Sequence, residues 1–218
     1  MKLLSYVVKY DSGLAPNPFG KFCTLALCTP NHMGADLKKG DWILGVSSKE
    51  HGSKIMYLMK LTEDPIGKNK YFDDKRFQYK KPKAKGTLSE IVGDNIYYQK
   101  NGEWIWKGVE GYHSSPKDWD KDTRRDKVYI SNEFYYFGAK AFDAGVKYSS
   151  ITSSRRGFKY FYEKDGIGQL IAAIIRRAGN RAGKIADPYL LIKKSESLQK
   201  IKGGIDKAMR DKNTGSCS

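Results

Sequence analysis

The 218-residue sequence predicts an α+β protein, with a β-rich curved sheet or barrel in its first two thirds and helices packed at its carboxyl end. Three observations lead to this fold class. Short apolar and aromatic runs alternate with turn-forming residues through the first two thirds of the chain, which is typical of many short strands. After about residue 150, apolar residues recur at helical spacing instead. The composition, 39% hydrophobic and 29% charged, is that of a folded globular protein.

Eight runs have the residue types and flanking turns of strands. They are Leu3–Tyr10, Phe22–Cys28, Trp42–Val46, Ile55–Leu61, Asn95–Gln99, Trp104–Lys107, Lys127–Ile130 and Tyr135–Phe137. Between the fifth and sixth runs, Asn101-Gly102 is typical of a two-residue hairpin turn, so we expect those two runs to pair.

The segment Asp64–Gly86 carries eight Lys and Arg residues, and its composition predicts an exposed loop. Tyr71, Phe72, Phe77 and Tyr79 interleave with these cations. Such a mixture suits a surface that follows phosphates and stacks on bases. The same residues would also suit a solvated loop whose aromatic side chains anchor it to the sheet.

Helical spacing begins near residue 166 and predicts a helix there. Its apolar residues are Ile167, Leu170, Ile171, Ile174, Ile175 and Ala178. A second helix is predicted over Ser195–Met209. We therefore expect a β-rich core over residues 1–149 and a basic helical extension over residues 150–218, where 15 Lys and Arg face 6 Asp and Glu.

The charge balance points to a polyanionic partner. Forty Lys and Arg against 24 Asp and Glu give a formal net charge of +16. An excess of this size attracts polyanions, of which DNA or RNA is favoured because binding releases condensed counterions. A lysine-rich surface that serves only solubility is the alternative.

The apolar runs and the cysteines bear on localisation and on metal binding. No apolar run approaches the roughly 20 residues that a membrane span needs, and the amino-terminal apolar run is too short for a signal peptide. We therefore expect a cytoplasmic protein with no membrane partner. Cys23, Cys28 and Cys217 have no metal-type spacing, so we expect free thiols, no metal and no cofactor.

Five stretches carry a resemblance to a known family. They are Tyr6–Phe19 (YVVKYDSGLAPNPF), Cys23–Cys28 (CTLALC), Lys39–Gly45 (KGDWILG), Gly93–Tyr97 (GDNIY) and Ile130–Gly138 (ISNEFYYFG). Over about residues 3–142 the chain resembles the nucleotide modification associated domain family, second type. That family belongs to bacterial and phage systems linked to modified DNA bases. The resemblance implies a place in such a pathway and no particular mechanism.

A weaker likeness is to PUA-like domains of the EVE and ASCH types, in which a similar turn opens a barrel strand beside a base-binding pocket. The stretch Lys38–Leu44 fits that pattern. We expect Gly40 to permit a tight turn and Asp41 to cap its amides. The likeness implies a PUA-like curved barrel.

The loop Asp11–Pro18 places a carboxylate, a hydroxyl and a carboxamide after the first strand, in a segment stiffened by prolines. Rigid polar loops position groups to read a base edge or hold a phosphate, although an Asx turn uses the same residue types. The candidate ligand-binding residues are Asp11, Ser12, Asn17, Asp94 and Asn95.

The sequence identifies no catalytic residue. Asp11 and His113 are candidates for acid–base roles, His113 because its imidazole titrates near neutral pH. His113 also suits a surface turn, and a nucleophilic cysteine would need such a base nearby. The candidate nucleic-acid-binding residues are Lys80, Lys81, Lys83, Arg155, Arg156, Arg177 and Arg181.

Three functions remain open on these observations. The favoured one is a nucleic-acid-binding or nucleotide-binding component of a DNA base-modification system, with DNA as the favoured partner. The second is an enzyme, a transferase or hydrolase, that acts on a nucleotide or modified base. The third is an adaptor or inhibitor that binds protein partners.

Overall fold

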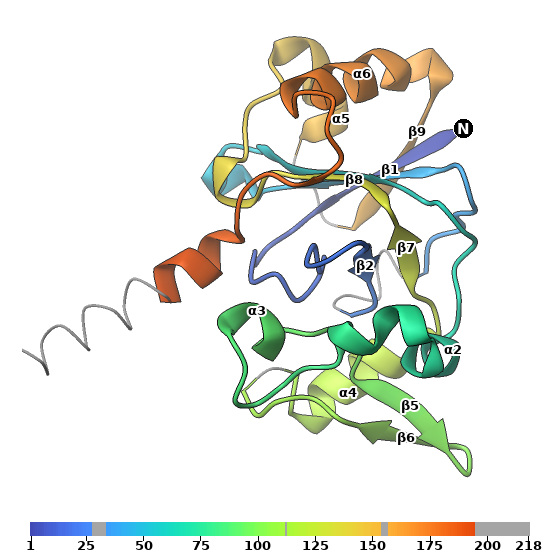
Figure 1. Cartoon of the computed structure of the whole chain (residues 1–218). Coiled ribbons are helices and arrows are strands. Elements are labelled where there is room, and N and C mark those ends of the chain that lie inside the picture. The colour runs from blue at the N-terminus through green and yellow to red at the C-terminus, as the bar shows by residue number, and fades with distance from the viewer. Residues whose placement is uncertain (28–33, 112, 154–156, 195–218) are drawn as a thin grey trace, which may run out of the picture.

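A curved, mixed sheet of six strands forms the centre of the molecule (Figure 1). The structure is a computed structural model, and it describes residues 1–27, 34–111, 113–153 and 157–194. In spatial order the strands are β10 (Gly183–Lys184), β8 (Glu133–Tyr136), β4 (Ile55–Lys60), β3 (Trp42–Val46), β1 (Lys2–Val7) and β9 (Phe158–Tyr162). The pairs β1–β3 and β10–β8 are parallel, and the other neighbours are antiparallel.

The predicted barrel is wrong, because the sheet is open. Among the described strands, β10 and β9 end the spatial order and do not pair with each other. All residues of β3 and the first five of β4 are buried, so both faces of these strands are covered. A strand in a barrel wall alternates between inward and outward residues, whereas an unbroken apolar run fits a layer covered on both sides. The α+β mixture itself is confirmed, and the PUA-like likeness stays a prediction.

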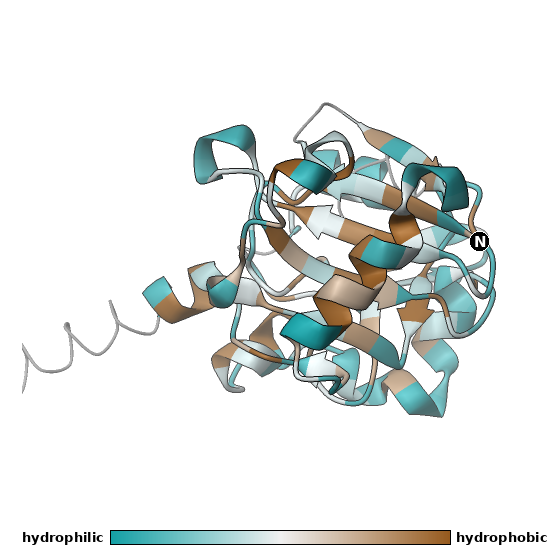
Figure 2. Cartoon of the chain, turned by 90° about the horizontal axis from the view of Figure 1, so that it is seen from above, coloured by the Kyte–Doolittle hydropathy of each residue, from teal (hydrophilic) through white to brown (hydrophobic). Residues whose placement is uncertain are grey.

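One face of the sheet is covered by α5 (Ser149–Thr152) and α6 (Ile167–Arg177), as Figure 1 shows. The helix predicted from residue 166 is confirmed as α6, which buries its apolar stripe on the sheet. Seen from this side, hydrophobic residues lie along the central strands, and hydrophilic residues dominate the surrounding loops (Figure 2). The buried residues of this layer include Leu3, Trp42, Leu44, Leu58, Phe161, Ile167, Leu170 and Ile174.

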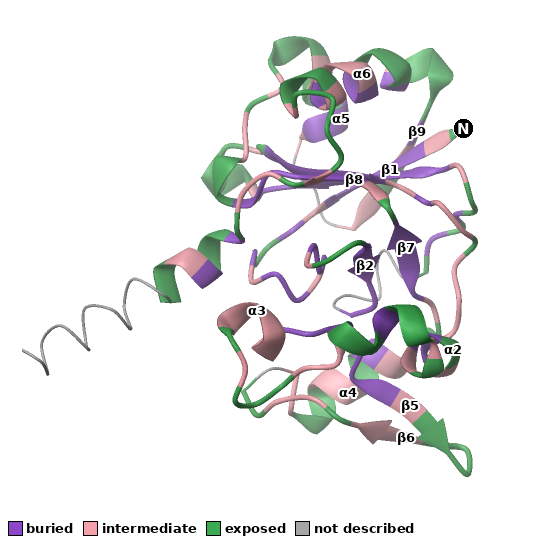
Figure 3. Cartoon of the chain, viewed as in Figure 1, coloured by how far each residue is buried: buried purple, intermediate pink, exposed green. Residues whose placement is uncertain are grey.

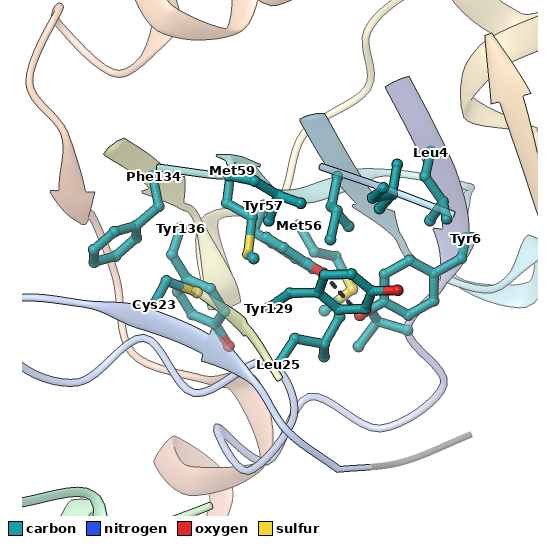
Figure 4. Packing of buried hydrophobic residues seen from close by; sticks show 14 of the residues in the cluster. Leu4, Tyr6, Cys23, Leu25, Met56, Tyr57, Met59, Tyr129, Phe134 and Tyr136 are labelled. Atoms are coloured by element: carbon teal, nitrogen blue, oxygen red, sulfur yellow. Dashed lines mark hydrogen bonds between the residues drawn. The ribbon is translucent and has the colours of Figure 1, made fainter. Parts of the chain in front are cut away.

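The opposite face packs against a small ribbon made of β2 (Cys23–Leu25) and β7 (Tyr129–Ser131). Figure 4 shows the tyrosine-rich core between them. The hydroxyl groups of Tyr6 and Tyr57 lie 2.8 Å apart within this core. Its residues include Leu4, Tyr6, Cys23, Leu25, Met56, Tyr57, Met59, Tyr129, Phe134 and Tyr136.

Beyond the ribbon lies a smaller lobe with a third apolar cluster. Its elements are α2 (Lys68–Asp73), η2 (Lys75–Lys80), α3 (Leu88–Ile91), β5 (Tyr97–Lys100), β6 (Glu103–Trp106) and α4 (Pro116–Thr123). The expectation that Asp64–Gly86 is an exposed loop is wrong, because α2 and η2 lie within it. Tyr71 and Phe77 are buried there and anchor the segment, so the anchoring interpretation holds for these two rings.

The predicted hairpin is confirmed as β5–β6, whose solvent-facing tip is visible in Figure 3. Asn101 and Gly102 both adopt positive φ angles, 54° and 84°. Two consecutive residues with positive φ match the twist of the flanking strands. The prediction for the turn at Gly40 is also confirmed: its φ is 91°, and Asp41 accepts the amide hydrogen bonds of Lys2 and Lys38 at 3.0 and 3.1 Å.

The remaining elements are short and connect the layers. They are the 3-10 turns η1 (Lys49–His51), η3 (Gly138–Lys140), η4 (Val146–Tyr148) and η5 (Glu163–Asp165). Each of the eight predicted strands overlaps an observed strand, whereas β9, β10 and the helices α2 to α5 were not predicted. The helix predicted over Ser195–Met209 lies outside the described residues. No helix within the described ranges has the length and apolar character to cross a membrane.

Candidate functional site: a buried polar network and a histidine–aspartate pair

Four of the five candidate ligand-binding residues lie inside the protein. Asn17, Asp94 and Asn95 are each 1% exposed and Asp11 is 6% exposed, whereas Ser12 is partly exposed. The side chains of the buried four contact other protein groups. Their proposed part in binding a ligand stays a prediction.

Asp94 joins three elements of the fold. Its carboxylate accepts hydrogen bonds from the hydroxyl groups of Thr24 in β2 and Tyr71 in α2, each at 2.7 Å. Asn95 follows, and its side-chain amide donates to the carbonyl oxygens of Tyr71 and Phe77 at 3.1 and 3.2 Å. Burial raises the pKa of Asp94 above its ordinary value. These contacts bind the smaller lobe to the β2–β7 ribbon.

Lys80 is the cation of this network. It was predicted to bind nucleic acid at the surface, but the structure buries it. The side chain is 1% exposed, and its ammonium donates to the Asn17 carbonyl, the Asn17 Oδ1 and the Phe22 carbonyl at 2.9, 2.6 and 2.8 Å. Burial lowers the pKa of Lys80 to about 8. An ammonium enclosed by three acceptors is not presented to a phosphate. Lys80 therefore holds the Asn17 loop in place.

Cys23 lies beside this network with its thiol fully buried. Burial raises the pKa of Cys23 to about 12. Because a thiolate is the reactive form of cysteine, this side chain is an inert part of the core.

Asp11 has a different set of partners from those of the network. One carboxylate oxygen accepts a hydrogen bond from the Tyr136 hydroxyl, and the other accepts the Tyr189 amide at 2.8 Å. The Leu190 amide donates to the Asp11 carbonyl at 3.0 Å. Burial raises the pKa of Asp11 above its ordinary value. Asp11 thus caps the helical turn that begins at Tyr189, and it has no contact with His113.

His113 forms a pair with a residue that the sequence did not single out. Its Nδ1 lies 2.5 Å from the carboxylate of Asp122, which also accepts the Tyr97 hydroxyl at 3.2 Å. The side chain of His113 is 21% exposed and that of Asp122 is 1% exposed. A buried carboxylate that holds an imidazole fixes the orientation of the ring.

Asp122 is positioned by helix α4, and His113 by the loop that precedes that helix. Asp122 lies near the end of α4, whose first turn Ser115 caps by accepting the Asp118 amide. His113 adopts a φ of +50°, and its carbonyl accepts the indole hydrogen of Trp119 at 3.2 Å. A non-glycine residue held at positive φ by its surroundings is a feature found at functional sites. The pair was missed because nine residues separate its members and no motif joins them.

The remaining predicted cations differ in how freely they could meet a phosphate. The ammonium of Lys81 lies 3.5 Å from the centre of the Phe72 ring, and Lys83 forms an ion pair with Glu90 at 2.7 Å. Arg177 and Arg181 are exposed. Arg155 and Arg156 lie outside the described residues.

No metal centre emerges from the parts of the chain that the structure describes, because no three His, Cys, Asp or Glu side chains gather there in a suitable cluster.

The fold and these contacts define a small α+β protein with an open sheet, a buried polar network and a histidine–aspartate pair. Residues 1–195 match the family described as nucleotide modification associated domain 2, and the chain belongs to that family. The match confirms the resemblance and extends beyond residue 142 to include α6 and β10. No curated protein and no solved structure matches the chain. Family membership associates the protein with nucleotide modification.

Proposed function

We propose that this protein is a nucleic-acid-binding component of a nucleotide-modification system, with DNA as its favoured partner. The observation that carries the proposal is a group of exposed arginines at the end of α6, namely Arg176, Arg177 and Arg181. Within the described residues, no carboxylate lies at ion-pairing distance from any of the three. The net charge of +16 gives the whole molecule an attraction for polyanions.

Arginine is suited to this role because its planar guanidinium donates two parallel hydrogen bonds to a phosphate. Cations in the last turn of a helix also interact favourably with the helix dipole, which accounts for part of the placement of Arg176 and Arg177. Arg181 lies beyond that turn, where the dipole has little effect. Its exposed position supports a contact with a partner.

Binding should weaken steeply with salt, and the arginines should account for part of the slope. Each phosphate contact contributes about −0.9 to the slope of log K against log salt concentration. We expect Arg176→Ala and Arg181→Ala each to reduce the slope by about 0.9, measured by fluorescence anisotropy of a short labelled DNA duplex between about 50 and 200 mM salt.

Arg124→Ala is the matched control, because it removes the same charge from an arginine already paired with Asp120 at 2.7 Å. It should leave the slope unchanged. Binding that does not depend on salt, or equal effects of all three substitutions, would contradict the proposal.

An enzyme that acts on a nucleotide or modified base is the second candidate, and the His113–Asp122 pair favours it. A general base typically contributes about 10²–10⁴-fold to the rate of a reaction. We expect His113→Ala to reduce the amount of any altered nucleoside in cells that carry the gene by about 100-fold, measured by mass spectrometry of hydrolysed DNA.

His51→Ala provides the control for this measurement. His51 is also bonded through Nδ1, to the hydroxyl of Ser48 at 2.8 Å, but it lies on an exposed turn. If nucleosides are the same with and without the gene, or if both substitutions act alike, the enzymatic role is excluded and the binding role remains.

A further inference from the structure

A cavity of about 330 Å³ lies between α6 and the loop that follows β8. Two segments that are far apart in the sequence form its walls. Its lining consists of Phe142, Asp143, Ala144, Tyr148, Leu170, Ala173, Ile174 and Arg177. The cavity is separate from the Asp94 network and from the His113–Asp122 pair, and it shares no residue with either.

The lining combines apolar residues of α6 with two aromatic residues of the facing loop. Leu170 and Ile174 are buried residues of α6, and Ala173 lies between them in the same helix. Phe142 is held by an edge-to-face contact with Phe137, at 4.8 Å between ring centres. The second aromatic residue, Tyr148, ends η4. Small alanine side chains at Ala144 and Ala173 leave the space between the two segments open.

One cation lines the cavity, and a second lies next to a lining residue. The guanidinium carbon of Arg177 is 5.3 Å from the centre of the Phe142 ring, and the ammonium of Lys147 is 5.3 Å from the centre of the Tyr148 ring. Lys147 also donates to the Gln169 side chain at 2.8 Å, which ties the loop to α6. Asp143 stabilises the loop by accepting the Gly145 amide at 2.8 Å.

A nucleotide has both an aromatic base and an anionic phosphate, which match the aromatic rings and the arginine of this lining. Its base is a flat ring system that stacks on aromatic side chains, and its phosphate is an anion that arginine binds through two hydrogen bonds. The volume is near the lower end of that of small-molecule sites, which suits one nucleotide rather than a larger ligand. A peptide or lipid tail would use the apolar lining but would not need a cation beside each ring.

We propose that this cavity holds a single nucleotide unit, with its base against Phe142 and Tyr148 and its phosphate at Arg177. The inference rests on the proposed function, because it names the place where one unit of a bound nucleic acid, or a free nucleotide, is held. The unit would be one that is unstacked from its neighbours, since a base inside a duplex is not accessible to such a cavity.

The position of the base can be tested by photo-crosslinking the full-length protein to 5-iododeoxyuridine, supplied as the monophosphate and within a short single strand. Trypsin separates the two rings, because cleavage after Lys140, Lys147 and Arg155 leaves Phe142 and Tyr148 in adjacent peptides. We expect the crosslink in one or both of these peptides. A crosslink found only elsewhere in the chain would overturn the proposal.

A second test fills the cavity without changing the charge. Ala173→Phe places a ring in the space, whereas Ala172→Phe adds the same ring one residue away on α6, outside the lining. We expect Ala173→Phe to weaken binding of thymidine monophosphate by about tenfold or more, measured by calorimetry, with Ala172→Phe close to the unchanged protein. Equal affinities of the two variants would overturn the proposal.

The two proposals can fail separately. If salt-dependent binding of duplex DNA is present in all variants while neither crosslinking nor the filled cavity has an effect, the cavity is excluded and the binding function stands. If the protein binds no DNA at any salt concentration but crosslinks the monophosphate at Phe142 or Tyr148, the cavity stands and the nucleic-acid-binding function is excluded.

Discussion

Replacing Lys80 by alanine is expected to lower the free energy of unfolding by about 3–5 kcal/mol, because it breaks a buried charge network. The substitution removes the donor to the Phe22 carbonyl and to two oxygens of Asn17. It also removes the cation that partly offsets the buried charge of Asp94. Urea denaturation followed by circular dichroism measures the change.

Two further variants separate the charge from the packing. Lys81→Ala removes a lysine that is partly exposed and should cost less than about 1 kcal/mol. Lys80→Met keeps most of the side-chain volume but has no donor, so it should be destabilised almost as much as Lys80→Ala. If Lys80→Met were as stable as the unchanged protein, the ammonium would not be what stabilises this region.

The pH dependence gives an independent measurement of the same group. Burial lowers the pKa of Lys80 from 10.5 to about 8. Above pH 8 the folded protein loses this proton while the unfolded chain still holds it, so the free energy of unfolding rises with pH up to about 10. Lys80→Ala should have a shallower rise. Between about pH 8 and 9 it should not be flat, because burial also lowers the pKa of Lys68 to about 8. Above about pH 9 the buried thiol of Cys23 acts in the opposite direction, because its pKa is raised and the unfolded chain loses that proton first.

Gly93→Ala is the second substitution for which we expect a large effect, a loss of about 3 kcal/mol or more. A Cβ atom at this position would lie 2.2 Å from the carbonyl oxygen of Lys80 and 2.8 Å from the nitrogen of Pro82. Both are backbone atoms, so a rotamer change cannot relieve the overlap. The segment that carries Lys80 would have to move away from Asp94, and the buried network would open.

Gly168→Ala is the matched control for Gly93→Ala. It lies in α6, and the nearest atom to its added Cβ would be a Glu163 oxygen at 3.6 Å. Because alanine favours a helix over glycine, this variant should be more stable by up to about 1 kcal/mol. Thermal unfolding of both variants tests the comparison, and a Gly93→Ala protein as stable as Gly168→Ala would contradict the close approach of the two segments.

The pattern of apolar residues predicted most of the sheet and one helix. Runs such as Trp42–Val46 and Ile55–Leu61 identify strands because so many successive residues are apolar, and the same feature explains why the sheet is not a barrel wall. The aromatic run of β9 does have strand-forming residue types, but it was missed because residues 150–218 were interpreted as helical. β10 is two residues long, and its pairing with β8 depends on contacts made across the fold.

The site was harder to predict, because burial of a polar residue depends on partners far away in the sequence. Asn17 and Lys80 are 63 residues apart, and Asp94 lies 70 residues from Thr24. Lys80 belongs to a run of lysines that is typical of an exposed segment. In the structure, oxygen atoms of Asn17 and Phe22 surround its ammonium. Asp94 and Asn95 were predicted to bind a ligand and are found in structural hydrogen bonds, because a residue type alone does not distinguish a structural contact from a ligand contact.

The place of β1 in the sheet has a consequence for how the chain acquires its structure. During synthesis β1 can pair with β3 early, but its second neighbour, β9, begins only at Phe158. Until then one edge of β1 lacks its hydrogen-bonding partner, and the apolar side chains that α6 later covers remain in contact with water. Pairing between such distant segments is slow, and an incomplete sheet of this kind is prone to associate with other chains.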